Sequence, residues 1–153
     1  MVLTHLIFTT HRQERVLVAY YTLANKSIVI PQKSFGKFGK TLQGRIKCHA
    51  TYDETLGTYS IPAPLVAQLG KNFYNNYNNL ISGRELLELA LNQLRKSQII
   101  MGGKFIYLEC EDKPKLVEFY ENNGFIEYDK RALDRDETNL EGDYLVQMMR
   151  YLK

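Results

Sequence analysis

The segment NNLISGRELLELAL, residues 78–91, combines the start of a helix with a feature that could bind an anion. Ser82 and Glu85 have the S-x-x-E spacing of a capping box, so we expect a helix to begin at Gly83. The first amides of a helix have no acceptor within it and carry the positive end of its dipole. Because Gly83 has no Cβ, a phosphate could approach these amides closely. The segment predicts either a phosphate-binding loop or simply a helix cap.

Arg84 would add a positive charge to this loop, which also suits an anion. Two common phosphate motifs are excluded, because the segment has neither the G-K-[ST] of a P-loop nor the G-x-G-x-x-G of a dinucleotide site. Any phosphate would therefore be bound mainly by backbone amides.

A second candidate is Tyr120, in the segment FYENNGF, residues 119–125. A phenol has an ordinary pKa of about 10, so it is protonated at neutral pH and could give its proton to a departing thiolate. The simpler interpretation is a core tyrosine whose hydroxyl is hydrogen-bonded.

The elements around these two segments are predicted to be strands, a helix, a strand, a helix and further strands. We expect strands at 5–10, 16–30, 58–70, 104–110, 125–131 and 144–152, with the polar stretch HRQER as a hairpin turn between the first two. Helices are expected at about 83–97 and 113–123, and Leu87, Ala90, Leu91 and Leu94 recur at helical spacing and should face the core. Asp112 would cap the second helix, and Gly124 would end it in a left-handed conformation. This order predicts an α/β (α+β) domain, with a mixed sheet and helices packed on it.

Three further regions carry structural expectations. Residues 31–57 hold four of the ten glycines and several lysines, and we interpret them as a long connection with weak structure. Pro62 and Pro64 favour an edge position or a bulge for the strand at 58–70. The apolar strand at 144–152 is expected at or near an exposed edge, where it could support a homodimer.

The bulk composition points to one soluble domain over residues 1–153. No stretch is long enough to span a membrane, and no signal peptide is recognised, so we expect a cytoplasmic protein without a membrane partner. Cys48 and Cys110 lie far apart and without histidines at ligand spacing, so neither a disulfide nor a metal site is expected. The net charge of +3 is compatible with an anionic ligand.

Together and in this order, the segments resemble the GNAT superfamily of acetyl-coenzyme A-dependent N-acetyltransferases. The resemblance covers about Val16 to the C-terminus. VAYYTLA (18–24) is similar to an early central strand of that family, and NNLISGREL occupies the place of its pyrophosphate loop. FYENNGF is similar to the segment in which a helical tyrosine is commonly the general acid. Within the superfamily, the paired segments YYTLA and FYENNGF are most similar to small acetyltransferases that include toxins of toxin–antitoxin modules.

The resemblance implies the GNAT fold, with a mixed, mostly antiparallel central sheet and flanking helices. It implies acetyl-CoA as co-substrate, no metal, and Tyr120 as the general acid for the CoA thiolate. The implied cofactor-binding residues are Leu69, Gly70, Lys71, Asn78, Asn79, Leu80, Ile81, Ser82, Gly83, Arg84, Lys113 and Phe119.

The chain also departs from the family pattern. Ile81 stands where the loop has its first glycine, and we expect its side chain to narrow the approach to the backbone. Asn78 replaces a Gln or Arg, and Lys113 replaces a common Asn. Family members usually have a strand and two helices before the hairpin, and this chain is expected to start after them unless residues 31–57 fill the gap.

The acceptor is left open by the sequence. It could be an amine-bearing small molecule, a protein amine or an aminoacyl-tRNA. Glu109 and Glu111 could act as a base through water, but solvated charges at a strand end are the simpler interpretation. Two competing function classes remain, a catalytically inactive GNAT-like binding or regulatory module and a plain RNA-binding α/β domain.

The region 33–47 bears on RNA binding because it interleaves basic and aromatic residues. Its basic residues are Lys33, Lys37, Lys40, Arg45 and Lys47, and its aromatic residues are Phe35 and Phe38. Such a loop could contact RNA, whereas a solvated basic loop is the favoured interpretation.

Overall fold

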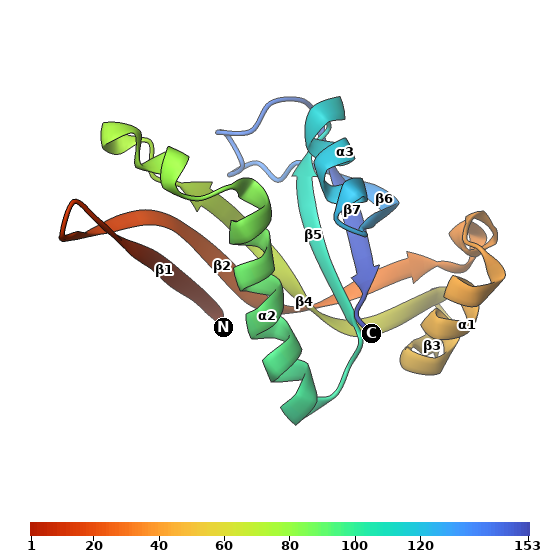
Figure 1. The fold of residues 1–153 in the computed structure, drawn as a ribbon. Coiled ribbons are helices and arrows are strands. Elements are labelled where there is room, and N and C mark those ends of the chain that lie inside the picture. The colour runs from red at the N-terminus through yellow and green to blue at the C-terminus, as the bar shows by residue number, and fades with distance from the viewer. The chain divides into compact units, whose positions relative to one another are not determined.

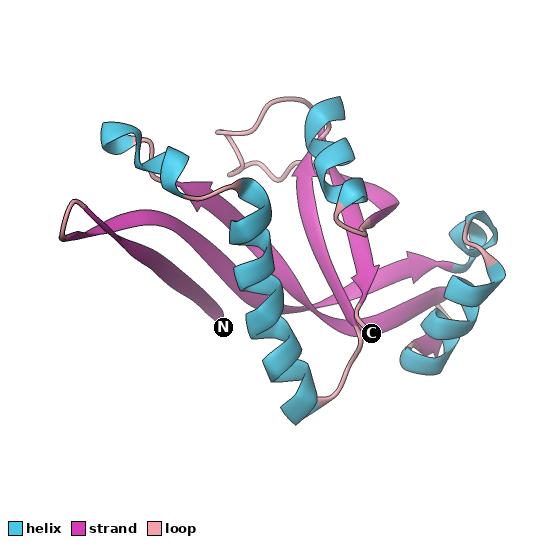
Figure 2. Cartoon of the chain, viewed as in Figure 1, coloured by secondary structure: helices cyan, strands magenta, loops and turns pink.

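A computed structural model describes residues 1–153 and shows a mixed α/β chain, as expected (Figure 1, Figure 2). The strands are β1 (Val2–His11), β2 (Glu14–Pro31), β3 (Thr51–Asp53), β4 (Thr58–Lys71), β5 (Phe105–Glu111), β6 (Ile126–Ala132) and β7 (Tyr144–Tyr151). The helices are α1 (Lys40–His49), α2 (Gly83–Met101) and α3 (Pro114–Asn122), and two 3₁₀ segments are η1 (Gln32–Lys37) and η2 (Tyr74–Leu80). The hydrogen-bonded strand order is β1-β2-β4-β5-β7-β6, with β3 beside β4. The β1–β2, β3–β4, β5–β7 and β6–β7 pairs are antiparallel.

The chain forms two compact units. Unit 1 comprises Met1–Asn25 and Leu65–Gly102, and unit 2 comprises Lys26–Pro64 and Gly103–Lys153. None of the helices is both long enough and apolar enough to cross a membrane.

Unit 1 contains the predicted hairpin. Arg12 and Gln13 form its turn, with positive φ values of 51° and 68°. Ile7 pairs with Ala19 and Phe8 pairs with Leu17, which leaves Val18 as an extra residue in β2. This bulge lets two consecutive residues, Val18 and Ala19, both be buried, whereas regular strand alternation would bury only one.

Helix α2 begins where the sequence predicts. The Ser82 hydroxyl accepts a hydrogen bond from the Glu85 amide, and the Glu85 carboxylate accepts one from the Ser82 amide. The predicted core residues Leu87, Ala90, Leu91 and Leu94 are buried. The helix continues to Met101, four residues beyond the expected end at Ser97.

The expectation of weak structure for residues 31–57 is wrong. Unit 2 forms η1, α1 and β3 there. Three apolar residues anchor this region, since Phe35, Phe38 and Ile46 are all buried. The Phe35 ring also stacks on the Tyr59 ring, with centroids 4.7 Å apart. These apolar residues are too widely spaced to give a strong periodic signal.

Neither strand expected at or near an edge is itself an edge strand, although β7 is the second strand from one end of the order. β7 lies between β5 and β6, so both of its sides are paired within unit 2. Its apolar side chains Leu145, Val146, Met148 and Met149 are core residues rather than an exposed interface. β4 likewise lies between β2 and β5 in the strand order.

Helix α3 starts at Pro114, one residue after the expected start, and its N-cap is Lys113 instead of Asp112. The Asp112 carboxylate is paired with the Lys130 ammonium at 2.9 Å, so it is not used as a cap. Gly124 ends the helix with a φ of +83°, which confirms the left-handed conformation expected there.

Candidate functional site

The C-terminal end of β4 carries Leu69, Gly70 and Lys71, and Asn72 fixes it to β2. The Asn72 amide donates to the Val18 carbonyl and its side-chain amide donates to the Leu17 carbonyl, each at 2.8 Å. Its side-chain oxygen accepts a hydrogen bond from the Tyr74 amide at 3.0 Å. Asn72 therefore joins the strand, the bulge and the start of the following loop. Sequence reasoning missed this role, although an asparagine directly after a strand is a turn signal.

Replacing Asn72 with alanine should destabilise unit 1. The Leu17 carbonyl and the Tyr74 amide would both lose a partner, which we expect to lower the free energy of unfolding by about 1–3 kcal/mol. Chemical denaturation of the Asn72→Ala variant measures this, and the exposed Asn79→Ala is the matched control. An unchanged unfolding midpoint for Asn72→Ala would contradict the anchoring role.

Gly70 is the glycine of β4 and is closely covered by Tyr20. A Cβ at Gly70 would lie 2.3 Å from Cε1 of the Tyr20 ring. Any larger residue must therefore displace this ring. The absence of a side chain lets Tyr20 lie directly over the strand backbone at this implied cofactor-binding position.

The loop from Tyr74 to Leu80 turns sharply before α2. Asn75 and Asn76 have left-handed φ values of 49° and 59°, which asparagine tolerates better than most residues. The Lys71 ammonium lies 3.4 Å from the Asn78 carbonyl and so links the end of β4 to this loop.

The side chain of Ile81 lies in the core of unit 1. It is 8% exposed and belongs to a buried cluster with Val18, Tyr21, Leu86 and Ala90. The expectation that Ile81 narrows an approach to the loop from solvent is therefore wrong. This isoleucine instead fixes the loop against β2 and α2.

The first turn of α2 keeps two backbone donors after capping. The capping box uses the amides of Ser82 and Glu85, and the first helical bond runs from the Leu86 amide to the Ser82 carbonyl. The amides of Gly83 and Arg84 have no acceptor within the helix. Hydrogen bonds from Ser82, with a smaller effect of the nearby Lys71 charge, lower the pKa of Glu85. The segment is thus a helix cap that still leaves two amides for a ligand.

In unit 2, Tyr120 lies near the end of α3 and is almost fully buried. Its ring contacts Phe119 and Phe125, with centroids 5.1 Å and 5.9 Å away. Burial, with a smaller effect of Cys110, raises the pKa of Tyr120 to about 12. The phenol is therefore protonated throughout the physiological range, as a proton donor must be.

Lys113 is the N-cap of α3, and Phe119 directly precedes Tyr120 in the helix. The Lys113 ammonium forms ion pairs with Glu111 and, at 3.1 Å, with Glu141. The Lys113 hydrogen bond lowers the pKa of Glu111, which makes this carboxylate a weaker base. Phe119 is half-buried, and its carbonyl accepts a hydrogen bond from the Asn123 side chain at 2.7 Å.

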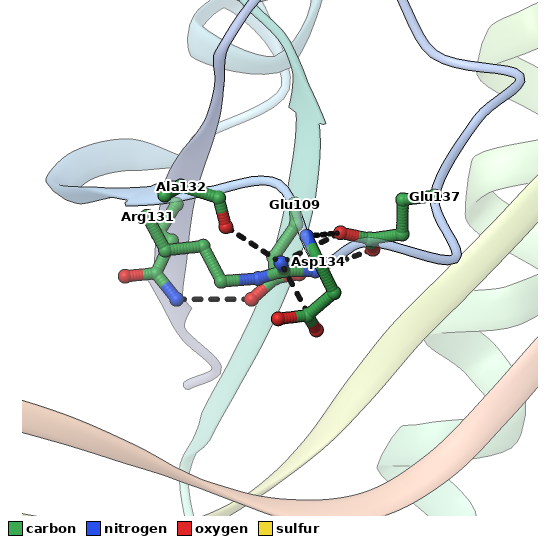
Figure 3. A network of polar contacts seen from close by, with 6 residues as sticks. Glu109, Arg131, Ala132, Asp134 and Glu137 are labelled. Carbon is green, nitrogen blue, oxygen red and sulfur yellow. Dashed lines mark hydrogen bonds and ion pairs between the residues drawn. The ribbon is translucent and has the colours of Figure 1, made fainter.

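Glu109 is also engaged, in the network drawn in Figure 3. Arg131 donates to Glu109 and to Glu137, with shortest contacts of 2.7 Å to each. Gln147 donates to the other Glu109 oxygen at 2.9 Å. The network ties β5, β6 and β7 to the loop that follows β6. A structural role accounts for Glu109, and neither proposed base is free of partners.

This network should make stability depend on acid pH. Arg131 and the Asp134 amide lower the pKa of Glu137 to about 2, below the ordinary value of about 4.3. The ionised form thus favours the folded state, and this contribution is present above about pH 4 and lost as the pH falls towards about 2. We expect Glu137→Gln to flatten the pH dependence of the free energy of unfolding in that range. Denaturant titrations at several pH values, with the exposed Glu118→Gln as control, check this.

The aromatic residues of region 33–47 are not available to stack on RNA bases. Phe35 and Phe38 are buried and contact each other edge to face at 6.3 Å. Arg45 packs over the Tyr151 ring at 4.3 Å, and Lys37 donates to the Tyr128 carbonyl. The aromatic part of the RNA hypothesis for this region is therefore wrong, although several of its lysines are exposed.

No protein-family model and no curated protein sequence matches the chain. Solved structures do match it. One is AtaT complexed with acetyl-methionyl-tRNAfMet, with a TM-score of 0.57 and 17% identity over 95% of this chain and 69% of that one. A variant of KacT matches with a TM-score of 0.56 and 16% identity over 95% and 69%. Naa20 of Chaetomium thermophilum, with a bisubstrate analogue, matches with a TM-score of 0.51 and 13% identity over 95% and 64%.

All three proteins are GNAT acetyltransferases, and AtaT and KacT are toxins. The chain has the GNAT fold. The predicted resemblance and the predicted sheet with flanking helices are thereby confirmed. Unit 1 contains Leu69–Lys71 and Asn78–Arg84, which the contact of Lys71 with Asn78 links. Unit 2 contains Lys113, Phe119 and Tyr120, of which the two aromatic rings are in contact.

Proposed function

We propose that this chain is an acetyl-CoA-dependent N-acetyltransferase in which residues 1–153 act as one domain. The observation that carries the proposal is the start of α2. In a chain with the GNAT fold, the Gly83 and Arg84 amides remain after capping, and Ile81 is turned into the core. Backbone donors at a helix N-terminus suit a pyrophosphate.

The residues suit two parts of acetyl-CoA, its pantetheine arm and its phosphates. Leu69, Gly70 and Lys71 would align the pantetheine arm, and the loop from Asn78 to Arg84 would bind the phosphates. In unit 2, Lys113 and Phe119 would make further contacts with acetyl-CoA. When bound, acetyl-CoA supplies an activated acetyl thioester.

The protein would accelerate the reaction mainly by positioning the amine and the thioester. An amine placed next to the thioester carbonyl attacks it directly, and good placement of two reactants supplies much of the rate. Tyr120 would give its phenol proton to the sulfur as the C–S bond breaks. No carboxylate is assigned as the base, because Glu109 and Glu111 are both engaged in ion pairs.

The acceptor is an amine, carried by a small molecule, a protein or an aminoacyl-tRNA. The AtaT structure contains acetyl-methionyl-tRNAfMet, which supports testing aminoacyl-tRNA. The Naa20 structure contains a bisubstrate analogue. The competing proposal is a GNAT-like binding module without catalysis. We place the protein in the cytoplasm.

Calorimetric titration of the purified chain with acetyl-CoA tests the first step. We expect micromolar binding, followed by release of free CoA when amines from the three acceptor classes are offered. Binding without CoA release across all three classes would favour the binding module. No binding at millimolar acetyl-CoA would contradict the proposed activity.

A further inference from the structure

β1 is at one end of the strand order, so one of its edges has no neighbouring strand in this chain (Figure 1). Such an edge presents unpaired N–H and C=O groups that can pair with another strand, and proteins usually protect it with charges, proline or a bulge. β6, at the other end of the order, is protected in this way. It carries Glu127, Asp129, Lys130 and Arg131 within the strand and has a register irregularity.

β1 has none of these protections. Its sequence, VLTHLIFTTH, contains no Asp, Glu, Lys, Arg or Pro. The extra residue of the hairpin bulge lies in β2, so β1 itself runs without interruption over ten residues. Val2, Leu3 and Leu6 are exposed, with Leu6 at 56%, and Phe8 is exposed with the Arg15 guanidinium 4.1 Å from its ring centroid. Both the backbone edge and apolar side chains are thus available to another strand.

The surface continues beside β1 on the side of α2. A groove of about 390 Å³ lies between Ile7–Thr9 of β1 and α2, and Glu85, Glu88 and Leu89 of α2 give it a mixed acidic and apolar lining. A strand added to β1 would place every second side chain on this side of the sheet. The apolar surface left beside β1 would then be partly covered.

We propose that β1 pairs antiparallel with β1 of a second copy, which makes a two-fold symmetric dimer with a continuous sheet. An identical strand is a suitable partner because neither β1 strand carries Asp, Glu, Lys or Arg, so pairing them buries apolar side chains without placing charged side chains of the two strands against each other. A partner chosen by charge would find no complementary charge on this strand.

The two-fold axis restricts the register. Two residues that face each other in an antiparallel pair have their side chains on the same side of the sheet. Because side chains alternate along each of two identical strands, both residue numbers must be even or both must be odd. Two registers that meet this condition pair the largest number of β1 residues. In one of them Leu6 faces Leu6 of the partner subunit, and in the other it faces Phe8 of the partner subunit. Leu6 therefore lies beside the symmetry axis in both.

Sedimentation equilibrium of the full chain from about 1 to about 300 µM tests the proposal directly. We expect a monomer–dimer equilibrium. Leu6→Lys places two like charges next to each other at the axis and should raise the dimer dissociation constant at least about tenfold. Ile126→Lys, an exposed isoleucine on the charged strand β6, is the matched control and should leave that constant unchanged.

A charge-swap experiment separates loss of pairing from loss of folding. Leu6→Glu alone should also be monomeric, whereas an equal mixture of Leu6→Lys and Leu6→Glu should recover a dimer. A wild-type chain that stays monomeric over the whole range overturns the proposal. So does a wild-type dimer whose affinity is unchanged by both Leu6 variants, or assembly into open-ended oligomers.

Discussion

Replacing Tyr120 with phenylalanine should lower kcat for acetyl transfer by about 100-fold or more, in keeping with the usual contribution of a general acid. The change removes only the hydroxyl from a ring that is buried against Phe119 and Phe125, so the packing of α3 should be kept. The affinity for acetyl-CoA should stay within about twofold, because the lost interaction is needed only as the thiolate departs. CoA release under saturating substrates and calorimetric binding of acetyl-CoA measure the two effects.

Tyr128 provides a matched control for this experiment. It is another deeply buried tyrosine of unit 2, and burial raises its pKa as it does that of Tyr120. We expect Tyr128→Phe to keep its turnover, since no role in catalysis is proposed for it. Equal activity in Tyr120→Phe and wild type would show that Tyr120 is only a core residue. Because the pKa of Tyr120 is about 12, its ionisation should cause no loss of activity up to about pH 10.

Local signals allowed part of this structure to be predicted from the sequence. The capping box of Ser82 and Glu85 marks the start of α2, and Gly124 marks the end of α3. In each case the stabilising interaction lies within a few residues of the signal. The hairpin turn at Arg12–Gln13 could be located for the same reason.

Features set by tertiary contacts could not be predicted in this way. Helix α1 buries only Ile46, so its sequence lacks the repeated apolar positions that mark an amphipathic helix. The interior position of β7 depends on which strands pair with it, and an apolar strand has the same sequence pattern at an edge or in the interior.

The candidate site shows the same division. The sequence locates the amides at the start of α2, but it does not give the direction of the Ile81 side chain. That direction depends on packing against β2 and α2, where Ile81 joins Val18 and Leu86 in one cluster. The anchoring role of Asn72 was missed because its acceptors, Leu17 and Val18, lie far away in the sequence.

Placing tryptophan at Gly83 should reduce the affinity for acetyl-CoA by at least about 100-fold. The indole would stand beside the two amides that capping leaves available, and losing two hydrogen bonds to a charged group is worth about 3 kcal/mol or more. Helix α2 should still form, since Ser82 and Glu85 supply the cap and Gly83 lies in its first turn. Calorimetric titration with acetyl-CoA measures the affinity, and circular dichroism checks the helix content.

Gly44→Trp is the matched control, because Gly44 is an exposed helical glycine in α1 with open space around its Cβ position. It should bind acetyl-CoA as the wild type does. If Gly83→Trp bound acetyl-CoA as well as the wild type does, the amides at the start of α2 would be hydrogen-bonded only to water. The phosphates would then be bound elsewhere. A selective loss in Gly83→Trp would mean that the same few residues both cap the helix and bind the anion. That dual use is physically consistent, because the capping box takes the amides of Ser82 and Glu85 and leaves those of Gly83 and Arg84.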